Sequence, residues 1–574
     1  MYPDNTEILF SALGTKGDIY PLIGLASNLM RRGHKVVFMT NDYFKPTIES
    51  HRIEFYSLGS KDSYMYHHCD KSLWDPKTDF FELAFSDYMK PAIRASYDYV
   101  KDRYAMHDNL LVISLSSLTS GAFMAAQALN IPAVLISLSP AYIPSRTYIH
   151  APLSWFIPNS APQFIKTAVF AFSKWRLSKA ISKKDYFIEL NQIRNEYGLP
   201  PVSASSFSPV SCSDNAFRIG FFPEWYGQRP SDWPDDLHLV GFPLFDEINN
   251  AARETVDNFI LHNGQPVLFT AGTGVFDTET LFTEGQKICN ELNVSGLFVG
   301  GGEQAADFIT SPNCIHVGYV DFEHVLPQCL AIVHHGGIGT LAQAVRSAIP
   351  QLIRPLTFDQ PENGCRVQRM GLGTYILPKL FKAKYVVPML KALIDGRHDN
   401  HQLHAYSADI KRNNAIGQAC DLIEGYLDGR AVKHSSSTHF DDKATDIPLI
   451  RETRKGESEF CCIAMLALSQ GVSVNVKNLC KQAPKSSGTR SLNDIKAILE
   501  NLGINSRALQ CPLQHLSELR LPCLIYFDVS RFVVLAGMNE SGMLVNDPTS
   551  EKQSYTHKEF QRRYSGIALE LAEH

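Results

Sequence analysis

The feature that most constrains the fold is a buried strand that runs into a glycine-rich turn and then a helix, because this pattern opens both halves of the first 428 residues. The first half begins with the strand EILFSA (7–12), the turn GTKGD (14–18), the helical pattern PLIGLASNLMRRG and the strand HKVVFMT. The second half alternates helical patterns with the apolar runs PVLFTAGTG (266–274), GLFVGGG (296–302), AIVHHGG (331–337) and PQLIRP (350–355). This order is typical of a doubly wound parallel sheet. We therefore predict two Rossmann-like α/β domains with a ligand cleft between them.

The length of 574 residues suggests three or four domains, at about 100–200 residues each. We expect an N-terminal Rossmann-like domain over residues 1–238 and a second one over 239–428, which a helix at 405–427 could close. Residues 429–446 are polar and irregular, as in a linker. Residues 447–574 are long enough to form a separate small domain.

Composition excludes several classes of protein. The chain carries 54 basic and 59 acidic side chains, a net charge of −5, so nucleic acid is not expected as a partner. Its 12 cysteines include no C-x-x-C pair and fit a reducing cytosol. We expect neither a signal peptide nor a transmembrane helix, because no basic segment precedes an apolar run and no apolar stretch reaches about 18 residues. A cytoplasmic location follows.

The strongest motif is VHHGGIGTLAQAVRSAIPQLIRPLTFDQPENGCR (333–366). An apolar strand delivers His334 to a turn, and Thr340 then opens a helix. A helix start is suited to an anion such as a diphosphate, to which His334 and the Thr340 hydroxyl could donate. Three residues permit tight backbone geometry in the turn: Gly336, Gly337 and Gly339.

Asp359 and Gln360 follow at another strand end and offer acceptor and donor groups for sugar hydroxyls. The alternative is that the glycines only serve a strand–helix turn, which the histidines cap. The combination of H-x-G-G-x-G-T with a downstream P-x-x-x-D-Q favours the ligand site over that alternative.

These motifs resemble the donor-binding signature of family 1 glycosyltransferases, which have the GT-B fold, and the resemblance runs from about residue 7 to residue 428. Within that family the sequence looks most similar to the rhamnosyltransferases of rhamnolipid synthesis. The runs that carry this likeness are LWDPKT (73–78), FFPEWYGQRPSDWP (221–234) and LHLVGFPLFD (237–246).

The resemblance implies a UDP- or dTDP-hexose donor, transferred with inversion and without a metal or cofactor. It implies that the sugar is held by Asp359 and Gln360, and that the base lies against Tyr319 and Val320. It assigns the diphosphate to His334, Gly339, Thr340, Gly272 and Thr273.

Catalysis needs a base for the acceptor hydroxyl. Asp18 is the candidate, since the resemblance places G-x-x-G-D in this loop in bacterial antibiotic, sterol and rhamnolipid members. The alternative is that Asp18 only caps a helix that begins near Pro21. The helix dipole and His334 would stabilise the leaving diphosphate, and no dense acidic cluster or D-x-D near the donor motif suggests a metal.

The acceptor side is expected in the first half, where residues 142–185 are rich in aromatic and basic side chains. A basic amphipathic helix here could rest on a membrane surface or admit a lipid-like acceptor. The alternative, which we favour from the sequence because acidic residues resume at Asp185, is an ordinary helix with a buried aromatic face and a solvated basic face. A lipid, a small natural product and a peptide all remain open as acceptors.

Residues 447–574 resemble the peptidase C39 domain, an α+β papain-like fold that cleaves leader peptides. The resemblance runs through ESEFCCIAMLALSQG (457–471), SSGTRSLNDIKAILENLGINSRAL (486–509), LPCLIYFDVSRFVVLAG (521–537) and LVNDPTSEKQSYTHKEFQRRYSG (544–566).

The catalytic positions of that family are degenerate here. Ser458 stands in place of the cysteine, Arg531 in place of the general-base histidine and Glu452 near the oxyanion glutamine, while the orienting aspartate remains as Asp547. A thiol protease needs a thiolate activated by a base. We therefore predict a non-catalytic module that binds a peptide or protein partner. A scaffold without chemistry and a bifunctional transferase–protease are the alternatives.

Overall fold

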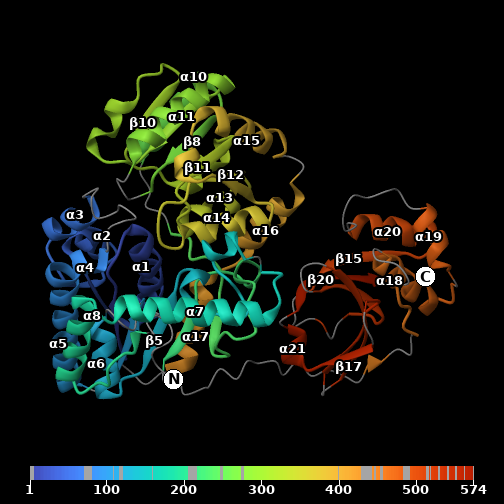
Figure 1. Ribbon diagram of the computed structural model, residues 1–574, viewed down its shortest axis with the longest axis horizontal. Helices are drawn as coiled ribbons and strands as arrows, with labels where there is room; N and C mark the ends of the chain where they lie inside the picture. Colours follow the sequence, from blue (N-terminus) through green and yellow to red (C-terminus); the bar gives the residue numbers. More distant parts are fainter. Residues whose placement is uncertain are drawn as a thin grey trace. The chain divides into compact units, whose positions relative to one another are not determined.

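The chain forms two compact units, residues Met1–Arg430 and Ala431–His574, which are described separately. In the first unit the computed structural model describes residues 6–69, 80–107, 109–115, 120–157, 159–204, 216–245, 250–272, 277–397 and 400–427 (Figure 1). In the second it describes 443–444, 448–452, 457–472, 474–482, 492–511, 516, 519–527, 531–539, 542–549, 552–561 and 563–572. The run LWDPKT (73–78) and Thr273 lie outside the described residues.

The first half of the first unit is a parallel sheet with strand order β3-β2-β1-β4-β5-β6-β7. The strands are β1 (Glu7–Ser11), β2 (Lys35–Thr40), β3 (Glu54–Ser57), β4 (Leu110–Ser114), β5 (Ala133–Ser137), β6 (Phe217–Gly220) and β7 (Leu237–Leu239). The helices are α1 (Lys16–Arg31), α2 (Lys45–Ser50), α3 (Lys61–Cys69), α4 (Phe80–Ala84), α5 (Lys90–Met106), α6 (Gly121–Leu129), α7 (Gln163–Ile181), α8 (Asp185–Glu196) and α9 (Glu224–Gly227). The apolar runs predicted as strands are strands.

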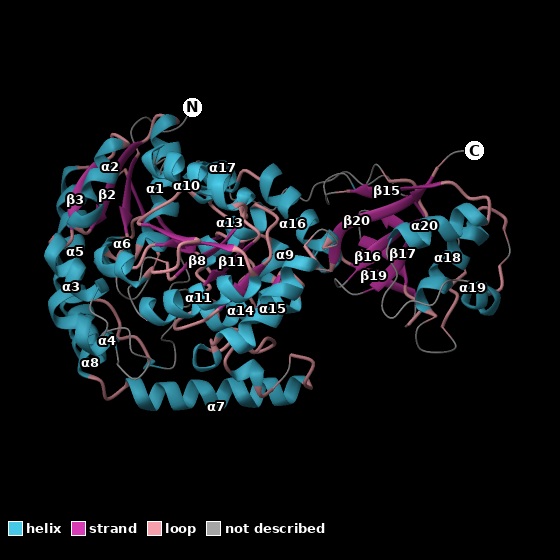
Figure 2. Ribbon diagram, turned by 90° about the horizontal axis from the view of Figure 1, so that it is seen from above, coloured by secondary structure: helices cyan, strands magenta, loops and turns pink. Residues whose placement is uncertain are grey.

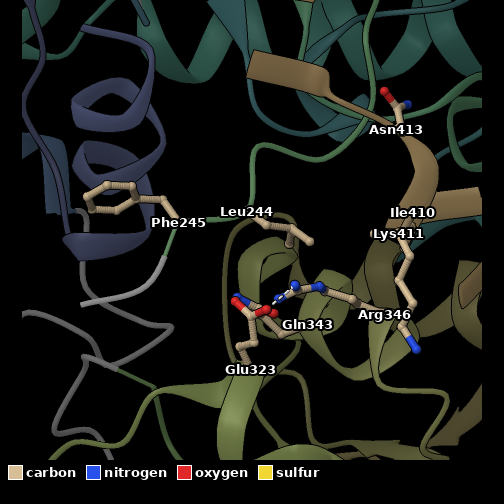
Figure 3. Close-up of a pocket in the computed structure, with 8 residues that line it drawn as sticks. All are labelled: Leu244, Phe245, Glu323, Gln343, Arg346, Ile410, Lys411 and Asn413. Carbon is tan, nitrogen blue, oxygen red and sulfur yellow. Dashed lines mark hydrogen bonds and ion pairs between the residues drawn. The ribbon is translucent and has the colours of Figure 1, made fainter. Parts of the chain in front are cut away.

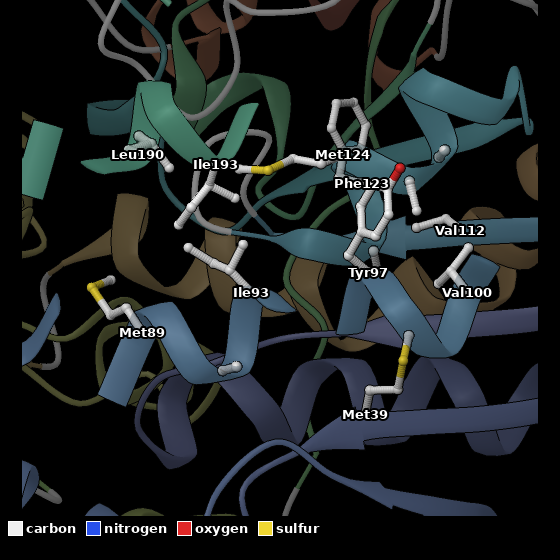
Figure 4. Close-up of a cluster of buried hydrophobic side chains, with 14 of the residues drawn as sticks. Met39, Met89, Ile93, Tyr97, Val100, Val112, Phe123, Met124, Leu190 and Ile193 are labelled. Carbon is white, nitrogen blue, oxygen red and sulfur yellow. The ribbon is translucent and has the colours of Figure 1, made fainter. Parts of the chain in front are cut away.

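Helices cover both faces of this sheet, which explains why its central strands are apolar on both sides. Strands β1, β4 and β5 are buried along their whole length. On one face, Met39 and Val112 of the sheet pack with Ile93 and Tyr97 of α5 and Phe123 of α6 (Figure 4). This packing fixes the carboxyl ends of the strands, where the site residues begin.

The second half is a parallel sheet with strand order β10-β9-β8-β11-β12-β13. The strands are β8 (Pro266–Thr270), β9 (Ser295–Val299), β10 (Cys314–Val317), β11 (Ala331–His334), β12 (Gln351–Ile353) and β13 (Gly373–Tyr375). The helices are α10 (Asn250–Asn263), α11 (Thr278–Leu292), α12 (Phe322–Val325), α13 (Ile338–Arg346), α14 (Gln360–Arg369), α15 (Ala383–Asp395), α16 (His401–Arg412) and α17 (Ala415–Leu427). The two Rossmann-like halves predicted from the sequence are thus present.

Two details differ from the expected boundaries. The expected border at 238/239 falls inside β7, which ends at Leu239. The single helix expected over 405–427 is two helices, and α17 packs with the first half: Ala419 and Ile423 join its core, and Arg32 of α1 pairs with Glu424 at 2.7 Å. After the second half the chain therefore returns to the first half, where α17 completes the helical layer against α1.

The second unit is α+β, as predicted, and its sheet is antiparallel with strand order β15-β20-β16-β17-β18-β19, while β14 pairs with β17. The strands are β14 (Lys443–Ala444), β15 (Ser506–Gln510), β16 (Cys523–Phe527), β17 (Arg531–Asn539), β18 (Gly542–Asn546), β19 (Lys552–Tyr555) and β20 (Tyr564–Leu571). The helices are α18 (Ser458–Ser469), α19 (Val476–Gln482), α20 (Leu492–Asn501) and α21 (His557–Gln561). Helix α18 contacts β17, which brings Ser458 and Arg531 onto neighbouring elements.

Candidate active site

Asp18 sits in the first turn of α1, directly after the loop that follows β1. Helix α1 begins at Lys16, five residues before the expected start, and Thr15 and Asp18 form a capping box. The Thr15 amide and hydroxyl donate to Asp18 Oδ2 at 2.8 and 3.0 Å. Gly14 has φ +147°, and a Cβ there would lie 2.4 Å from Asp18 Oδ2. The loop therefore requires glycine and holds the carboxylate in one orientation. Asp18 caps the N-terminus of α1, whether or not it is also the catalytic base.

Asp18 and Asp359 come from different halves, and the negative charge of Asp18 acts on Asp359. Burial and, to a smaller extent, the negative charge of Asp18 raise the pKa of Asp359 to about 6, against hydrogen bonds from Asn363 and Ser139. Burial also raises the pKa of Asp18, against the hydrogen bonds from Thr15. Tyr142, at the end of the 3₁₀ turn Pro140–Tyr142, is 37% exposed, but burial of its hydroxyl and both carboxylates raise its pKa well above the usual value. Tyr142 therefore remains a neutral hydrogen-bond donor.

Asp359 is fixed by a network that the sequence did not indicate. Asn363, one turn further along α14, donates to Asp359 Oδ2 and to the Gly336 carbonyl, both at 2.9 Å. Tyr226 donates to Asn363 Oδ1 at 2.6 Å, and the Ser139 hydroxyl hydrogen-bonds Asp359 from the first half. The i, i+4 spacing of Asp359 and Asn363 is the signal that could have revealed this pair.

Gln360 is the first residue of α14, and its Oε1 accepts from the Leu356 and Thr357 amides at 2.8 and 3.1 Å. Its amide nitrogen is then the group left to offer a ligand. Phe358 has φ 55°, a left-handed conformation that non-glycine residues adopt rarely. Strain of this kind tends to occur at ligand sites, and here it directly precedes Asp359.

His334 and His335 occupy different environments. His334 has no exposed surface; its Nδ1 accepts from the Gly336 amide at 3.1 Å, and its Nε2 lies 3.0 Å from Gln351 Oε1. Burial lowers its pKa to about 3, so the ring is neutral and donates at Nε2 to Gln351. Both ring nitrogens are therefore engaged inside the protein, and the expectation that His334 donates to phosphate does not fit this geometry.

His335 lies in the loop itself. A Cβ built on Gly272 would come within 2.3 Å of its ring, and one on Gly337 within 2.4 Å. Burial lowers its pKa to about 4, and its Nδ1 is buried without a hydrogen-bond partner among the described residues. The ring therefore lies between the two backbone turns expected to hold phosphate.

The strand register brings these turns together. His334 of β11 pairs with Thr270 of β8 and with Ile353 of β12, so three carboxyl ends meet. Helix α13 starts after Gly337, and Thr340 is its third residue. Gly339 is exposed, and nothing lies within 4 Å of a Cβ there, so its amide is open to a ligand. This arrangement forms a concave backbone surface at a helix N-terminus.

Tyr319 and Val320 precede α12 at the edge of the second sheet. The Val320 side chain is 2% exposed and packs in the core, so only its backbone can meet a ligand. The Tyr319 ring lies under the Lys16 ammonium, 5.0 Å from its centroid, which joins the two halves at the start of α1.

The loop after β5 is bound to α14 through Glu362, which is 1% exposed. Tyr148 and the Ala151 amide each donate to its carboxylate at 2.7 Å, and Arg366 pairs with it at 2.8 Å. Burial opposes ionisation, but neighbouring His150 and Arg366 lower the pKa of Glu362 to about 2. The helix that begins beside Asp359 therefore also anchors the loop on the acceptor side.

Two cavities lie near these elements. One of ≈390 Å³ is enclosed by the loop from Ala141 to Leu153 and by α7, with Tyr142 in its wall. The other, of ≈210 Å³, lies between α13 and the α16–α17 turn and contains the Arg346–Glu323 ion pair (Figure 3). None of the expected donor residues lines the second cavity, so it is separate from the site.

The peptidase-like positions gather in the second unit. Arg531 Nη2 lies 3.0 Å from Asp547 Oδ2, and Arg531 also donates to Thr549. Ser458 is the first residue of α18, and the Glu452 amide donates to the Pro548 carbonyl at 3.0 Å. The aspartate is therefore held by an arginine.

Cys461 and Cys462, three and four residues after Ser458 in the sequence, are fully buried. Burial raises the pKa of Cys461 to about 12 and that of Cys462 well above its usual value. Both remain protonated thiols, which are poor nucleophiles.

Three regions of the chain match known protein families. Residues 8–103 match the glycosyltransferase family 28 N-terminal domain, and residues 301–419 match the C-terminal domain of proteins like erythromycin biosynthesis protein CIII. Residues 446–574 match the peptidase C39 family. The donor motif lies inside the second match and Asp18 inside the first.

Relatives and solved structures agree with these matches. O-mycaminosyltylonolide 6-deoxyallosyltransferase of Streptomyces fradiae is 23% identical over 443 residues, covering 75% of this chain and 99% of that protein. A sterol 3-beta-glucosyltransferase of Glomerella lagenarium is 25% identical, covering 73% of this chain and 28% of its own length. The calicheamicin glycosyltransferase structure has a TM-score of 0.52 at 18% identity, covering 74% of this chain and 99% of its own. The first unit therefore has the GT-B fold.

Proposed function

We propose that this chain, a glycosyltransferase of the GT-B fold joined to a C39 peptidase-like domain, moves a hexose from a UDP- or dTDP-sugar to a hydroxyl group of an apolar acceptor. The observation that carries the proposal is the pair Asp18 and Asp359, which come from opposite halves and which, in addition to burial, both raise the pKa of Tyr142. Transfer requires a base on the acceptor side and a sugar-binding group on the donor side, and this pair supplies both.

Asp18 is the proposed base. Its carboxylate takes the proton of the acceptor hydroxyl as that oxygen bonds to the anomeric carbon, while the bond to the diphosphate breaks and its electron pair leaves with the diphosphate. A single displacement inverts the anomeric centre. Desolvation raises the pKa of Asp18 and makes it a stronger base, while Thr15 keeps it oriented.

The donor lies across the ends of β8, β11 and β12. The diphosphate meets the amides at the start of α13, the Thr340 hydroxyl and the turn at Gly272, and His335 takes the role that the sequence suggested for His334. Asp359 and Gln360 hold the sugar, and Tyr319 with the Val320 backbone meets the base. In this proposal the helix dipole and these hydrogen-bond donors stabilise the leaving diphosphate without a metal.

The acceptor enters beside Tyr142. The runs similar to the rhamnosyltransferases of rhamnolipid synthesis support a lipid-like hydroxyl acceptor, and the relatives' names support a natural product or a sterol. The run similar to the rhamnosyltransferases at residues 221–234 includes Tyr226. Tyr226 donates a hydrogen bond to Asn363, which in turn holds Asp359. None of the ten cysteines whose side chains the structure describes forms a disulfide bond, which supports a cytoplasmic location.

A panel of UDP- and dTDP-sugars, with mass detection of products, tests the activity. Asp18→Asn is expected to abolish transfer while diphosphate binding persists. Asp102→Asn, at an exposed position on α5, is the matched control and is expected to behave as the unmodified protein. Near-normal transfer by Asp18→Asn would remove the assigned base.

The C39-like domain has a proposed role of its own, as a module that binds a peptide without cutting it. The Arg531–Asp547 pair carries this proposal, because an arginine cannot accept a proton from a nucleophile. A quenched-fluorescent peptide library should show no cleavage, and a peptide array should identify ligands. Cleavage that disappears in Ser458→Ala would show a working protease instead.

A further inference from the structure

Helix α7 turns an apolar stripe towards solvent. Of its 19 residues only Ile181 is buried. Phe164 is 74% exposed, and Phe172 and Trp175 are each 57% exposed. Helices of soluble domains normally bury such a stripe. The ordinary helix with a buried aromatic face, which the sequence favoured, is therefore wrong.

The exposed positions follow the helical repeat. The exposed apolar residues on the outward face are Phe164, Ala168, Phe172 and Trp175, which are three or four positions apart, and Ala171, which adjoins Phe172. Figure 2 shows α7 along the edge of the first unit, with no helix or strand of that unit beyond it. The stripe is thus an uncovered surface within the described part of this unit.

Charge identifies what would cover this stripe. No aspartate or glutamate occurs between Asp108 and Asp185, although the whole chain has a net charge of −5. The bases in and directly after α7 are Lys166, Lys174, Arg176, Lys179, Lys183 and Lys184. Exposed aromatic rings among cations fit the boundary between anionic lipid headgroups and acyl chains. A second copy packing α7 against α7 would instead bring like charges together.

The inner side of α7 and Tyr142 line the same cavity. Val169, Phe170 and Ser173 line the ≈390 Å³ cavity, whose opposite wall includes Tyr142 and Ile149. Tyr142 is the residue on which both carboxylates of the site act. One face of the helix is therefore an uncovered apolar stripe, and the other face lines a cavity whose wall includes Tyr142.

We propose that α7 seats this protein on an anionic membrane surface, and that the cavity behind it takes a membrane-borne amphiphile whose hydroxyl receives the sugar. The proposed membrane binding rests only on the exposed apolar residues and the positive charge of α7. The amphiphile as acceptor rests on the proposed glycosyl transfer.

Vesicle flotation with the full chain tests the seating. Binding is expected to phosphatidylglycerol–phosphatidylcholine vesicles, with weakening at high salt and little binding to phosphatidylcholine alone. The variant Phe172→Ser/Trp175→Ser should bind at least tenfold less. Leu261→Ser, which removes a 78% exposed apolar side chain from α10, is the matched control and should bind normally. No binding, or equal binding by the double variant, would overturn the proposal, as would light scattering that shows a dimer lost in that variant.

Two readouts separate this proposal from the proposed reaction. Asp18→Asn should bind vesicles normally while transferring no sugar. The double variant should hydrolyse donor at the normal rate in solution but lose transfer to a hydroxyacyl lipid embedded in vesicles. Normal transfer to the embedded lipid by the double variant would refute the loading route and leave the reaction itself intact.

Discussion

Replacing each of the two adjacent histidines with alanine should separate structure from ligand binding. His334→Ala leaves the Gly336 amide and Gln351 Oε1 without partners in a site that has no exposed surface. An unsatisfied buried group costs about 1–3 kcal/mol, so the two together cost about 2–6 kcal/mol. For a domain of this size the expected fall in Tm is on the order of 10 °C.

His335→Ala should have the opposite effect: it should weaken diphosphate binding and leave the Tm nearly unchanged. No hydrogen bond of its ring occurs among the described residues, so the fold loses only the packing between two glycine turns. A hydrogen bond to a charged phosphate contributes about 1.5–3 kcal/mol, which corresponds to roughly 10- to 150-fold weaker binding of UDP or dTDP.

Thermal unfolding and calorimetric titration of both nucleoside diphosphates measure these two effects. His324→Ala removes the imidazole of a partly exposed histidine that is paired with Asp257. It is the matched control and should change neither the Tm nor the affinity for the diphosphates. If His334→Ala kept the normal Tm and lost diphosphate binding, the assignment of the two histidines would be reversed. If His335→Ala bound both diphosphates normally, the unpaired ring would have no part in the donor site.

Three further predictions concern the carboxylates. Tyr226→Phe frees Asn363 from its 2.6 Å hydrogen bond and should lower kcat several-fold with little change in diphosphate binding; an unchanged kcat would show that Asn363 holds Asp359 without help. The kcat/KM profile should fall as pH drops below about 6, because the ionised forms of Asp18 and Asp359 are the active ones and both have raised pKa values; a profile flat to pH 5 would contradict this. Asp359 has a folded-state pKa above its unfolded value, so folding loses stability as pH rises from about 4 to 6; Asp359→Asn should raise stability at pH 7 by up to about 3 kcal/mol in chemical denaturation while reducing transfer.

The sequence predicts the strands well because a parallel sheet covered on both faces needs uninterrupted apolar runs, which glycine turns then delimit. It predicts the start of α1 poorly, since Lys16 and Gly17 read as a turn; Thr15 and Asp18, three positions apart, were the overlooked capping signal. It could not separate His334 from His335. When both faces of a strand are buried, alternation does not tell which ring points inward, and only the partners of each nitrogen decide it.

Other parts of the site are harder to predict from the sequence. Ser139 and Tyr142 lie on an irregular loop after β5, and their approach to Asp359 depends on how the two halves pack. The orientation of α7 was misjudged for a related reason. Its pattern of aromatic and basic residues indicates a helix with two faces, but a periodic pattern does not say which face meets the protein.

Helix α14 links the two sides of the proposed reaction, and this link decides how pH effects should be understood. Its start carries Asp359, and Glu362 on the same helix holds the acceptor loop through Tyr148 and the Ala151 amide. Because the pKa of Glu362 is lowered to about 2, its contribution is complete above its unfolded pKa and is lost only as pH falls towards 2. The loop therefore stays attached between pH 5 and 7, where Asp359 titrates. A fall in activity over that range would consequently report the carboxylates in the cleft, with the acceptor loop still in place.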